Sequence, residues 1–545
     1  MPVLSNRNSS TELPRWFLIA LAAAWILPGL VGHEPWKPDE AYSFGLVYHI
    51  LQTGDWIVPT LAGEPFMEKP PLFYLTAALF AKLFSGVLPL HDGARLATGF
   101  YMALALFATA LTARELYGRV TTAVLALLAC LGLAPLAHLL ITDMALLAGL
   151  ALGLYGFALG LRRNIVGGLC LGTGAGIAFL AKGLIGPGLL GLVVLLLPTL
   201  SPAWRKRAYF QSLAAAAVAA LPWLLVWPIA LYLRSPELFM TWLWDNNLGR
   251  FLGFGRLGPR NDEPFFYVYT LLWFAWPSWL LAAWTLWSGG PAGLKRPSTL
   301  LPLAALATML AVLSVAADGR EVYALPLLLP LALLAAPALG TLPRVVATGL
   351  YGLGIVAFFI VAAGLWFAWA ATEYGLPAAL AAALAEQQPG YTPATGFGAV
   401  AIAVFYSIGG VAALYATRRF SERSLIAWVL TTALLLGLAM TILLPWLDTG
   451  KAYRGVFTSL KQALPTSYRC VAGDGLGEPQ RAMLDYYAGI RTHRVGVSPV
   501  TSCDLLLLQE KVDEPRQLDG RDWELLWRGA RPGDAKELFR LFRRR

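Results

Sequence analysis

The feature that most constrains this chain is a succession of apolar runs, most of them long enough to cross a lipid bilayer. A helix needs about 20 apolar residues to cross the hydrocarbon core. Only 14% of the 545 residues are charged and the mean hydropathy is +0.61, whereas a soluble domain carries about 25% charged residues. We therefore predict an α-helical polytopic membrane protein with about thirteen transmembrane helices. The predicted spans are residues 15–32, 95–113, 120–140, 143–161, 164–181, 183–200, 208–232, 265–288, 299–317, 321–340, 344–371, 395–416 and 424–446.

The apolar stretch 72–90 is excluded from these spans, because Lys82 and Gly86 interrupt it and prolines bound it. With the N-terminus in the cytoplasm, the exclusion places basic clusters such as 205–207 and 418–419 on the cytoplasmic side, as the positive-inside rule expects. We therefore expect 72–90 to be a juxtamembrane helix at the outer face, either interfacial or re-entrant. An odd number of spans then puts the C-terminus outside, in the periplasm of a Gram-negative cell.

Charged residues concentrate in the last part of the chain, where short strand-like and helix-like segments alternate. We predict a transmembrane domain over 1–447, with outer loops at 33–94 and 234–264, and a small periplasmic α/β domain over 448–545. Cys470 and Cys503 both lie in that domain. A disulfide in an oxidising compartment and two buried thiols are the alternatives for them.

Ionisable residues gather at the predicted outer ends of the spans. Such residues are costly at membrane depth, so they are candidates for function. A polar cavity at the outer face is the main interpretation, and a secondary transporter, which carries its charges at mid-depth between repeated halves, is the alternative. The net charge of +10 does not indicate nucleic-acid binding, because many basic residues lie in short loops between apolar runs.

A series of short motifs makes the interpretation more specific. In chain order they are "TGDWIVP", "EKPPLFY", "GARL", "TDMAL", "AFLAKG", "NNLGRF", "EPFFYVY" and "REVYALPLLLP", after an acidic pair at residues 39–40. Their order and spacing resemble those of the polyprenyl-phosphate-dependent membrane glycosyltransferases of the bacterial protein-mannosyltransferase-like group. Within that group, the likeness is greatest to the aminoarabinose transferases that modify lipid A.

The resemblance implies transfer of 4-amino-4-deoxy-L-arabinose from undecaprenyl phosphate to a lipid A phosphate, at the periplasmic face of the inner membrane. The same machinery with another polyprenyl-linked sugar, or with a protein acceptor, is the alternative. Membrane lipids would then be partners and nucleic acid would not. The resemblance further places Asp39 at the catalytic acidic position and Asp143 at the border of the active site; the alternative for Asp143 is an N-cap of the following helix.

The departing group in such a reaction is a phosphate anion, which cations must stabilise. Lys69 is the first candidate, because Pro70 and Pro71 stiffen the backbone that carries it. Snorkelling of its amine to the interface is the alternative. Further cations expected to bind the substrate are Lys182, Arg250, Arg256 and Arg320, with Arg260 competing for the role of Arg256.

The acids have open roles. Asp39 is a general base if a hydroxyl attacks, and an orienting or charge-balancing group if a phosphate attacks. Glu68 is an ion-pair partner of Lys69, a metal ligand, or the group that holds the sugar amine. Glu40 binds substrate or stabilises a helix N-terminus. Tyr267 and Tyr323 either bind sugar or phosphate, or belong to an interfacial aromatic belt.

No cofactor is required by these motifs. The five histidines show no metal-ligand spacing, and neither a P-loop nor a dinucleotide fingerprint is present in the sequence. A lipid-linked donor makes a nucleotide unnecessary. A divalent metal held by carboxylates, with His33 nearby, stays an alternative.

Overall fold

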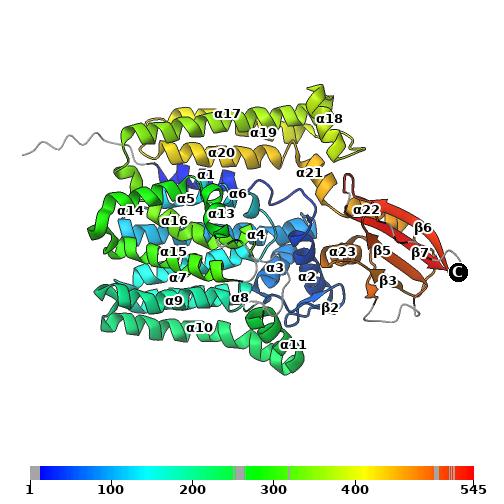
Figure 1. Ribbon diagram of the computed structural model, residues 1–545, viewed down its shortest axis with the longest axis horizontal. Helices are drawn as coiled ribbons and strands as arrows, with labels where there is room; N and C mark the ends of the chain where they lie inside the picture. The colour runs from blue at the N-terminus through cyan, green and yellow to red at the C-terminus, as the bar shows by residue number, and fades with distance from the viewer. Residues whose placement is uncertain are drawn as a thin grey trace, which may run out of the picture.

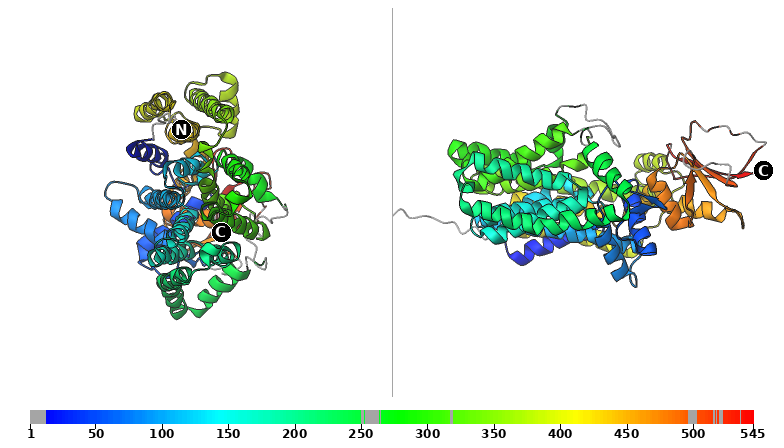
Figure 2. Two further views of the ribbon diagram at one scale, coloured as in Figure 1. Left: turned by 90° about the vertical axis from the view of Figure 1, so that its left-hand side faces the viewer. Right: turned by 90° about the horizontal axis from the view of Figure 1, so that it is seen from below.

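The computed structural model describes residues 13–249, 252, 263, 265–316, 319–495, 503–514, 516, 518, 522–534 and 536–545. A bundle of long helices runs across the molecule, and a mixed β-sheet lies beyond one end of it (Figure 1). The view from below shows the same order, with helices α2 and α3 between the bundle and the sheet (Figure 2, right). Helix α2 spans Asp39–Thr53 and helix α3 spans Leu72–Phe84.

Eight helical segments within the described residues are long and apolar enough to cross a membrane, and two bent pairs raise the number to ten. They confirm a multi-pass α-helical membrane protein, but not the count of thirteen. The eight are α4 (Leu90–Tyr117), α7 (Asp143–Gly160), α8 (Asn164–Lys182), α10 (Arg207–Arg234), α15 (Pro297–Val315), η3 (Glu321–Ala324) with α16 (Leu325–Ala335) and η4 (Ala338–Gly340), α17 (Arg344–Tyr374) and α19 (Phe397–Thr417). The bent pairs are α13 (Phe266–Phe274) with α14 (Ser278–Leu294), at 105°, and α20 (Arg423–Ala439) with α21 (Leu444–Lys451), at 70°.

The other three predicted spans are shorter or broken. Helix α1 covers only Arg15–Ile26 and helix α9 only Ile185–Leu200. The stretch 120–140 splits into α5 (Thr121–Ala129) and α6 (Leu133–Leu136), because Cys130 adopts an extended backbone conformation between them. Almost all of α5 is buried. Its apolar sequence therefore reflects packing inside the bundle as much as contact with lipid.

The segment between α1 and α4 forms a cap over one end of the bundle. Helix α2 ends at Gly54, whose left-handed backbone suits glycine. A two-stranded hairpin follows, with β1 (Thr60–Leu61) antiparallel to β2 (Glu64–Pro65). Helix α3, at 13 residues, is too short to cross the hydrocarbon core, in agreement with the exclusion of 72–90 from the spans.

The remaining short helices connect the bundle or accompany the sheet. Those in the first 250 residues are η1 (Pro202–Trp204), α11 (Pro236–Met240) and η2 (Thr241–Gly249), the last wound as a π-helix. Those in the C-terminal part are α18 (Ala378–Gln387), α22 (Arg454–Gln462), α23 (Glu478–Met483) and η5 (Leu484–Ala488).

The C-terminal sheet has five strands in the order β4-β3-β5-β7-β6. The pairs β3–β4 and β3–β5 are parallel, whereas β5–β7 and β6–β7 are antiparallel. This mixed sheet with its helices confirms a small C-terminal α/β part. The strands are β3 (Val471–Asp474), β4 (Thr492–Arg494), β5 (Leu505–Glu510), β6 (Trp523–Ala530) and β7 (Leu538–Arg544).

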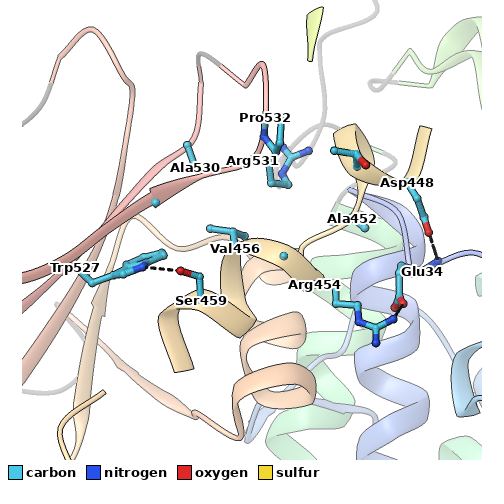
Figure 3. A pocket seen from close by; sticks show the side chains of 13 residues that line it. Glu34, Asp448, Ala452, Arg454, Val456, Ser459, Trp527, Ala530, Arg531 and Pro532 are labelled. Atoms are coloured by element: carbon cyan, nitrogen blue, oxygen red, sulfur yellow. Dashed lines mark hydrogen bonds and ion pairs between the residues drawn. The ribbon is translucent and has the colours of Figure 1, made fainter. Parts of the chain in front are cut away.

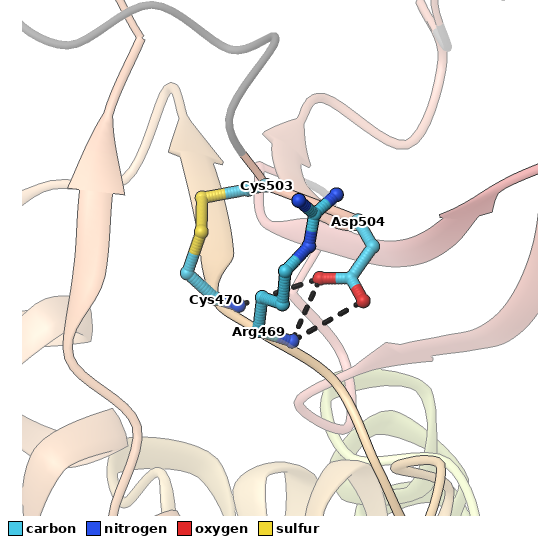
Figure 4. The surroundings of a disulfide bond; sticks show 4 residues. All are labelled: Arg469, Cys470, Cys503 and Asp504. Carbon is cyan, nitrogen blue, oxygen red and sulfur yellow. Dashed lines mark hydrogen bonds between the residues drawn. A yellow bond between two sulfur atoms is a disulfide. The ribbon is translucent and has the colours of Figure 1, made fainter.

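A disulfide joins Cys470, just before β3, to Cys503, just before β5 (Figure 4). Beside it, the carboxylate of Asp504 accepts hydrogen bonds from the backbone N–H groups of Arg469 and Cys470. Of the two alternatives for these cysteines, the structure contains the disulfide. It links the N-terminal ends of two adjacent parallel strands.

Candidate active site

The first turn of α2 carries two acids in different surroundings. Asp39 is half-buried, whereas Glu40 is 1% exposed. The Glu40 carboxylate accepts hydrogen bonds from Arg95 Nε (2.9 Å) and the backbone N–H groups of Leu140 (2.9 Å) and Trp36 (3.2 Å). Protein donors therefore occupy both of its oxygens. This arrangement favours a structural role for Glu40 over the predicted contact with substrate.

Arg95 completes this buried network. It lies in the "GARL" motif on α4 and is 1% exposed. Its guanidinium also donates to Asp92 Oδ1 (2.7 Å) and to the carbonyl oxygens of Leu30 and His33. A buried guanidinium with this many acceptors fixes the start of α2 against α4. The network thereby sets the position of Asp39.

Lys69 lies between the β-hairpin and α3, and its side chain turns back toward α2. Its Nζ atom donates to the hydroxyl of Tyr42 at 2.5 Å and lies 5.0 Å from the centre of the Tyr42 ring. Burial by itself would lower the pKa of Lys69, but the groups around it outweigh burial and raise that pKa. Those groups are Tyr74, Asp143, Glu68 and Asp39. Lys69 is therefore held as a cation.

Asp143 and Lys182 form a second charged pair, at the meeting point of two bundle helices. Asp143 opens α7, and its carboxylate forms an ion pair with Lys182 at the end of α8. The N-cap residue of α7 is Thr142. Asp143 is therefore not the N-cap of α7, and its carboxylate has an ion-pair partner instead. Tyr323, in η3, places its ring 4.3 Å from the Lys182 amine.

The turn that follows Lys182, in the "AFLAKG" motif, also contacts the "NNLGRF" motif. Gly183 has a φ of 71°, in the left-handed region that favours glycine. The side-chain oxygen of Asn247 packs against Gly183, where a Cβ atom would clash with it, and accepts a hydrogen bond from Leu184 N at 3.1 Å. Motifs about 60 residues apart in sequence therefore meet at one side of the site.

The two lysines belong to one cluster, since the charge of Asp143 acts on Lys69 as well as on Lys182. The structure thus brings six predicted residues together at the end of the bundle that α2 and α3 cover. They are Asp39, Glu68, Lys69, Asp143, Lys182 and Tyr323.

The remaining predicted residues lie around this cluster or outside the described part of the chain. Tyr267, on α13, is 1% exposed. Arg320 lines a cavity of about 420 Å³ whose other walls are mostly apolar, among them Phe266, Trp273 and Phe274. Arg250 and Arg256, and their competitor Arg260, are outside the described residues, so their roles stay predictions.

Two residues near the cluster were missed by the sequence analysis. Tyr42 accepts the hydrogen bond of Lys69, and only its place one helical turn after Asp39 could have indicated this. Glu478, at the start of α23, lies more than 400 residues from Lys69 in sequence. Burial, and after it the charge of Glu68, raises the pKa of Glu478. Nothing in the sequence connects this part of the chain to the cluster.

Metal binding at the cluster stays a prediction. Within the described residues, the only group of three side chains with a metal-like arrangement is Cys470, His493 and Cys503. Its two cysteines form the disulfide.

Comparison with proteins of known structure shows which fold this is. The chain aligns with a crystal structure of ArnT from Cupriavidus metallidurans bound to undecaprenyl phosphate, with a TM-score of 0.71 and 19% identity. The alignment covers 96% of this chain and 97% of that one. The chain has the ArnT fold. The same ArnT in the apo state aligns with a TM-score of 0.72 and 18% identity, again over 96% and 97% of the two chains.

Curated relatives agree with the resemblance found in the motifs. An undecaprenyl phosphate-α-4-amino-4-deoxy-L-arabinose arabinosyl transferase of Pseudomonas aeruginosa is 30% identical over 348 residues, which is 59% of this chain and 58% of that protein. The corresponding protein of Serratia proteamaculans is 27% identical over 325 residues, or 58% and 57%. The matched regions thus span less than two thirds of these relatives. No protein-family model matches the chain.

Proposed function

We propose that this protein is a pentosyltransferase that moves 4-amino-4-deoxy-L-arabinose from undecaprenyl phosphate to a phosphate group of lipid A. The observation that carries the proposal is the cluster of Lys69 and Lys182 with their flanking acids, at one end of an apolar helical bundle. The names of the curated relatives and the ArnT fold support the choice of donor and sugar.

In this reaction an oxygen of the acceptor phosphate attacks the anomeric carbon of the sugar. The bond from that carbon to the undecaprenyl phosphate oxygen breaks, and its electron pair goes to the departing phosphate. Lys69 and Lys182 are placed to neutralise that anion, a contribution of several kcal/mol in a site shielded from water. Tyr42 and Asp143 hold the two amines in position.

The acceptor phosphate is already ionised, so the attack needs no strong base. Asp39 then orients the acceptor or balances the positive charge that develops on the sugar carbon. Glu68 is suited to hold the ammonium group of the sugar, because it lies beside Lys69 and its charge reaches the same pocket. The cavity next to Arg320, with its apolar walls, is suited to a lipid that carries a phosphate.

We further propose that the cluster and the C-terminal sheet face the periplasm, across the inner membrane from the basic loops at 205–207 and 295–296. The positive-inside rule supports this orientation. A disulfide in the C-terminal part is consistent with an oxidising compartment. In this scheme residues 1–447 are the membrane domain and 448–545 the periplasmic domain.

The test is reconstitution of the purified protein in liposomes with undecaprenyl phosphate-aminoarabinose and lipid A. Mass spectrometry should detect lipid A that carries one added aminoarabinose. Parallel reactions with another polyprenyl-linked sugar and with a peptide acceptor test the substrate. Product in only those reactions would overturn the assignment of substrate, and movement of the lipid-linked sugar without any product would indicate a transporter.

A further inference from the structure

The C-terminal part of the chain packs directly against the segment that carries the lysine and acid of the candidate site. Helix α23 meets α2 and β1 at a three-way junction of Gly45, Leu61 and Ala482. A Cβ atom at Gly45 would lie 2.5 Å from the Ala482 Cβ and 2.8 Å from a Leu61 methyl carbon. Only glycine at this position permits so close an approach, so α23 and the hairpin are fixed against α2.

Arg481 makes the polar contacts of this junction. Its side chain is 6% exposed and donates from Nη1 to Glu64 Oε2 at 2.9 Å, and from Nη2 to the carbonyl oxygen of Leu61 at 3.3 Å. Glu64 and Leu61 are register partners in the hairpin. A single buried guanidinium therefore holds both strands. Arg494 adds a weaker contact with Glu64, at 3.4 Å.

Two aromatic rings, those of Phe66 and Tyr42, connect the hairpin to Lys69. Phe66 directly follows β2 and hydrogen-bonds back to Pro59 O, at 2.7 Å. Its ring stacks on the Tyr42 ring with 5.7 Å between centroids. The Tyr42 hydroxyl in turn accepts the hydrogen bond of Lys69. A shift of the hairpin would therefore move both Lys69 and the group that aims it.

We propose that Arg481 is a positioning residue for the transfer reaction: from the C-terminal sheet region it clamps the β1–β2 hairpin so that the Lys69 amine stays at Tyr42. The inference rests on the proposed function, in which Lys69 neutralises the departing phosphate. Arg481 donates its hydrogen bonds to Glu64 and Leu61, so it acts on Lys69 through the hairpin.

A second contact from the same region supports this view. Lys37, two residues before Asp39, forms ion pairs with Asp534 (2.5 Å) and Glu537 (3.7 Å). Nearby, Arg454 pairs with Glu34 at 2.7 Å, on the wall of a cavity of about 440 Å³ between α21, α22 and the sheet (Figure 3). The C-terminal region thus contacts the capping segment both before α2, at Glu34 and Lys37, and after it, at the hairpin. Arg481 makes the buried contact with the hairpin, which precedes Lys69 in the chain.

The test compares three full-length variants in liposomes: R481A, R481K and the matched control R540A. Arg540 is a suitable control because it also donates to an acid and a carbonyl oxygen, Glu510 Oε2 (2.8 Å) and Arg516 O (2.6 Å), but within the sheet region. Two quantities are measured, the kinetic constants of transfer and the rate at which an amine-reactive reagent modifies Lys69, read by mass spectrometry.

R481A should lower kcat by about 10- to 100-fold, the size of effect that a displaced catalytic group produces, with a smaller change in KM. Its Lys69 should react severalfold faster with the reagent, because the amine leaves Tyr42 and the surrounding acids. R481K should recover part of both properties, whereas R540A should match the wild type. Equal Lys69 reactivity in R481A and wild type, with each variant folded, would overturn the clamp.

The two readouts separate the clamp from the proposed function. If the wild type transfers no sugar to lipid A, the proposed function fails, but Lys69 labelling still tests the clamp. If R481A does not fold, E64Q takes its place, since it weakens the same contact from the hairpin side and should give the same two changes. Unchanged kcat and labelling in folded E64Q would also overturn the clamp.

Discussion

The amine of Lys69 donates a hydrogen bond of 2.5 Å to the hydroxyl of Tyr42, one turn into the helix that Asp39 begins. This contact joins the two parts of the capping segment that carry the candidate chemistry. A lysine side chain has several rotatable bonds, so an unheld amine would occupy many positions. Tyr42 restricts it to one, next to the acids that keep it charged.

Replacement of Lys69 by Ala should lower kcat by about 10²- to 10³-fold, the usual loss when one group that stabilises a developing anion is removed. K69R keeps the charge but not the geometry and should recover only part of the activity. Initial rates with undecaprenyl phosphate-aminoarabinose and lipid A provide the measurement. Y42F should lose less activity than K69A, because it leaves the Lys69 amine charged but removes the hydroxyl that positions it. Near-normal turnover of folded K69A would remove Lys69 from the mechanism.

The Asp143–Lys182 pair can be tested by a double-mutant cycle. If Lys182 contacts the donor phosphate, K182M should lower kcat/KM about 10²-fold, and the double variant D143N/K182M should be no more active than K182M. If Lys182 only balances the buried charge of Asp143, the double variant should recover activity, because neither group is then left unpaired. The cycle is measured as kcat/KM for the lipid donor. Recovery in the double variant would assign the pair to structure.

The Glu40–Arg95 network makes a prediction about stability. Both side chains are 1% exposed, so loss of one partner leaves a buried charge uncompensated. R95A should lower the free energy of unfolding by about 3–5 kcal/mol, measured by denaturant titration of the protein in detergent. The control is R162A, which removes the 75% exposed side chain of Arg162 from its pair with Glu115 and should cost less than about 1 kcal/mol. Equal stability of R95A and R162A would contradict the structural role of Glu40.

The sequence predicted the multi-pass helical fold and the small C-terminal α/β part, whereas the roles of the candidate site residues stay predictions. Asp39, Lys69, Asp143 and Lys182 became candidates because ionised residues are rare at the ends of apolar runs, so each of them carries information by itself. The span count was less accurate because hydropathy does not report a break such as that at Cys130. A buried helix and a lipid-facing helix have similar composition.

Partners from distant parts of the chain could not be predicted at all. Tyr42 is one of 20 tyrosines, and only its contact with Lys69 distinguishes it. Arg481 and Glu478 belong to the short helix α23; the sequence pattern predicts a helix at Arg481 and a strand-to-helix connection at Glu478. Their relation to the hairpin and to Glu68 depends on how the C-terminal sheet docks, which no local pattern specifies.

Glu478 gives a prediction about pH. Burial and the charge of Glu68 raise its pKa above the ordinary 4.5, although Arg481, Lys69 and Arg494 oppose the shift. Because the pKa is higher in the folded state, the stability that Glu478 contributes is present below about pH 4.5 and is lost as the pH rises through the folded-state pKa. E478Q should therefore raise the melting temperature at pH 7.5, by roughly 1–2 °C.

The difference between E478Q and wild type should be smaller at pH 4, since most of Glu478 is then protonated in both the folded and the unfolded state. D474N is the control, because Asp474 pairs with Arg516 at 2.6 Å on the sheet. A stabilisation of E478Q that is equal at both pH values would show that the repulsion with Glu68 is not its cause.

Asp39→Asn distinguishes the two chemical roles of that acid. With a lipid A phosphate as acceptor, no proton has to be removed, so D39N should retain activity within about 10-fold of wild type. With a hydroxyl acceptor, loss of a general base should lower kcat by about 10²- to 10⁴-fold. The wild-type rate with a phosphate acceptor should also stay constant as the pH rises above the second ionisation of that phosphate. A loss of more than 10²-fold in folded D39N, together with a rate that increases with pH, would therefore replace lipid A phosphate with a hydroxyl group as the acceptor.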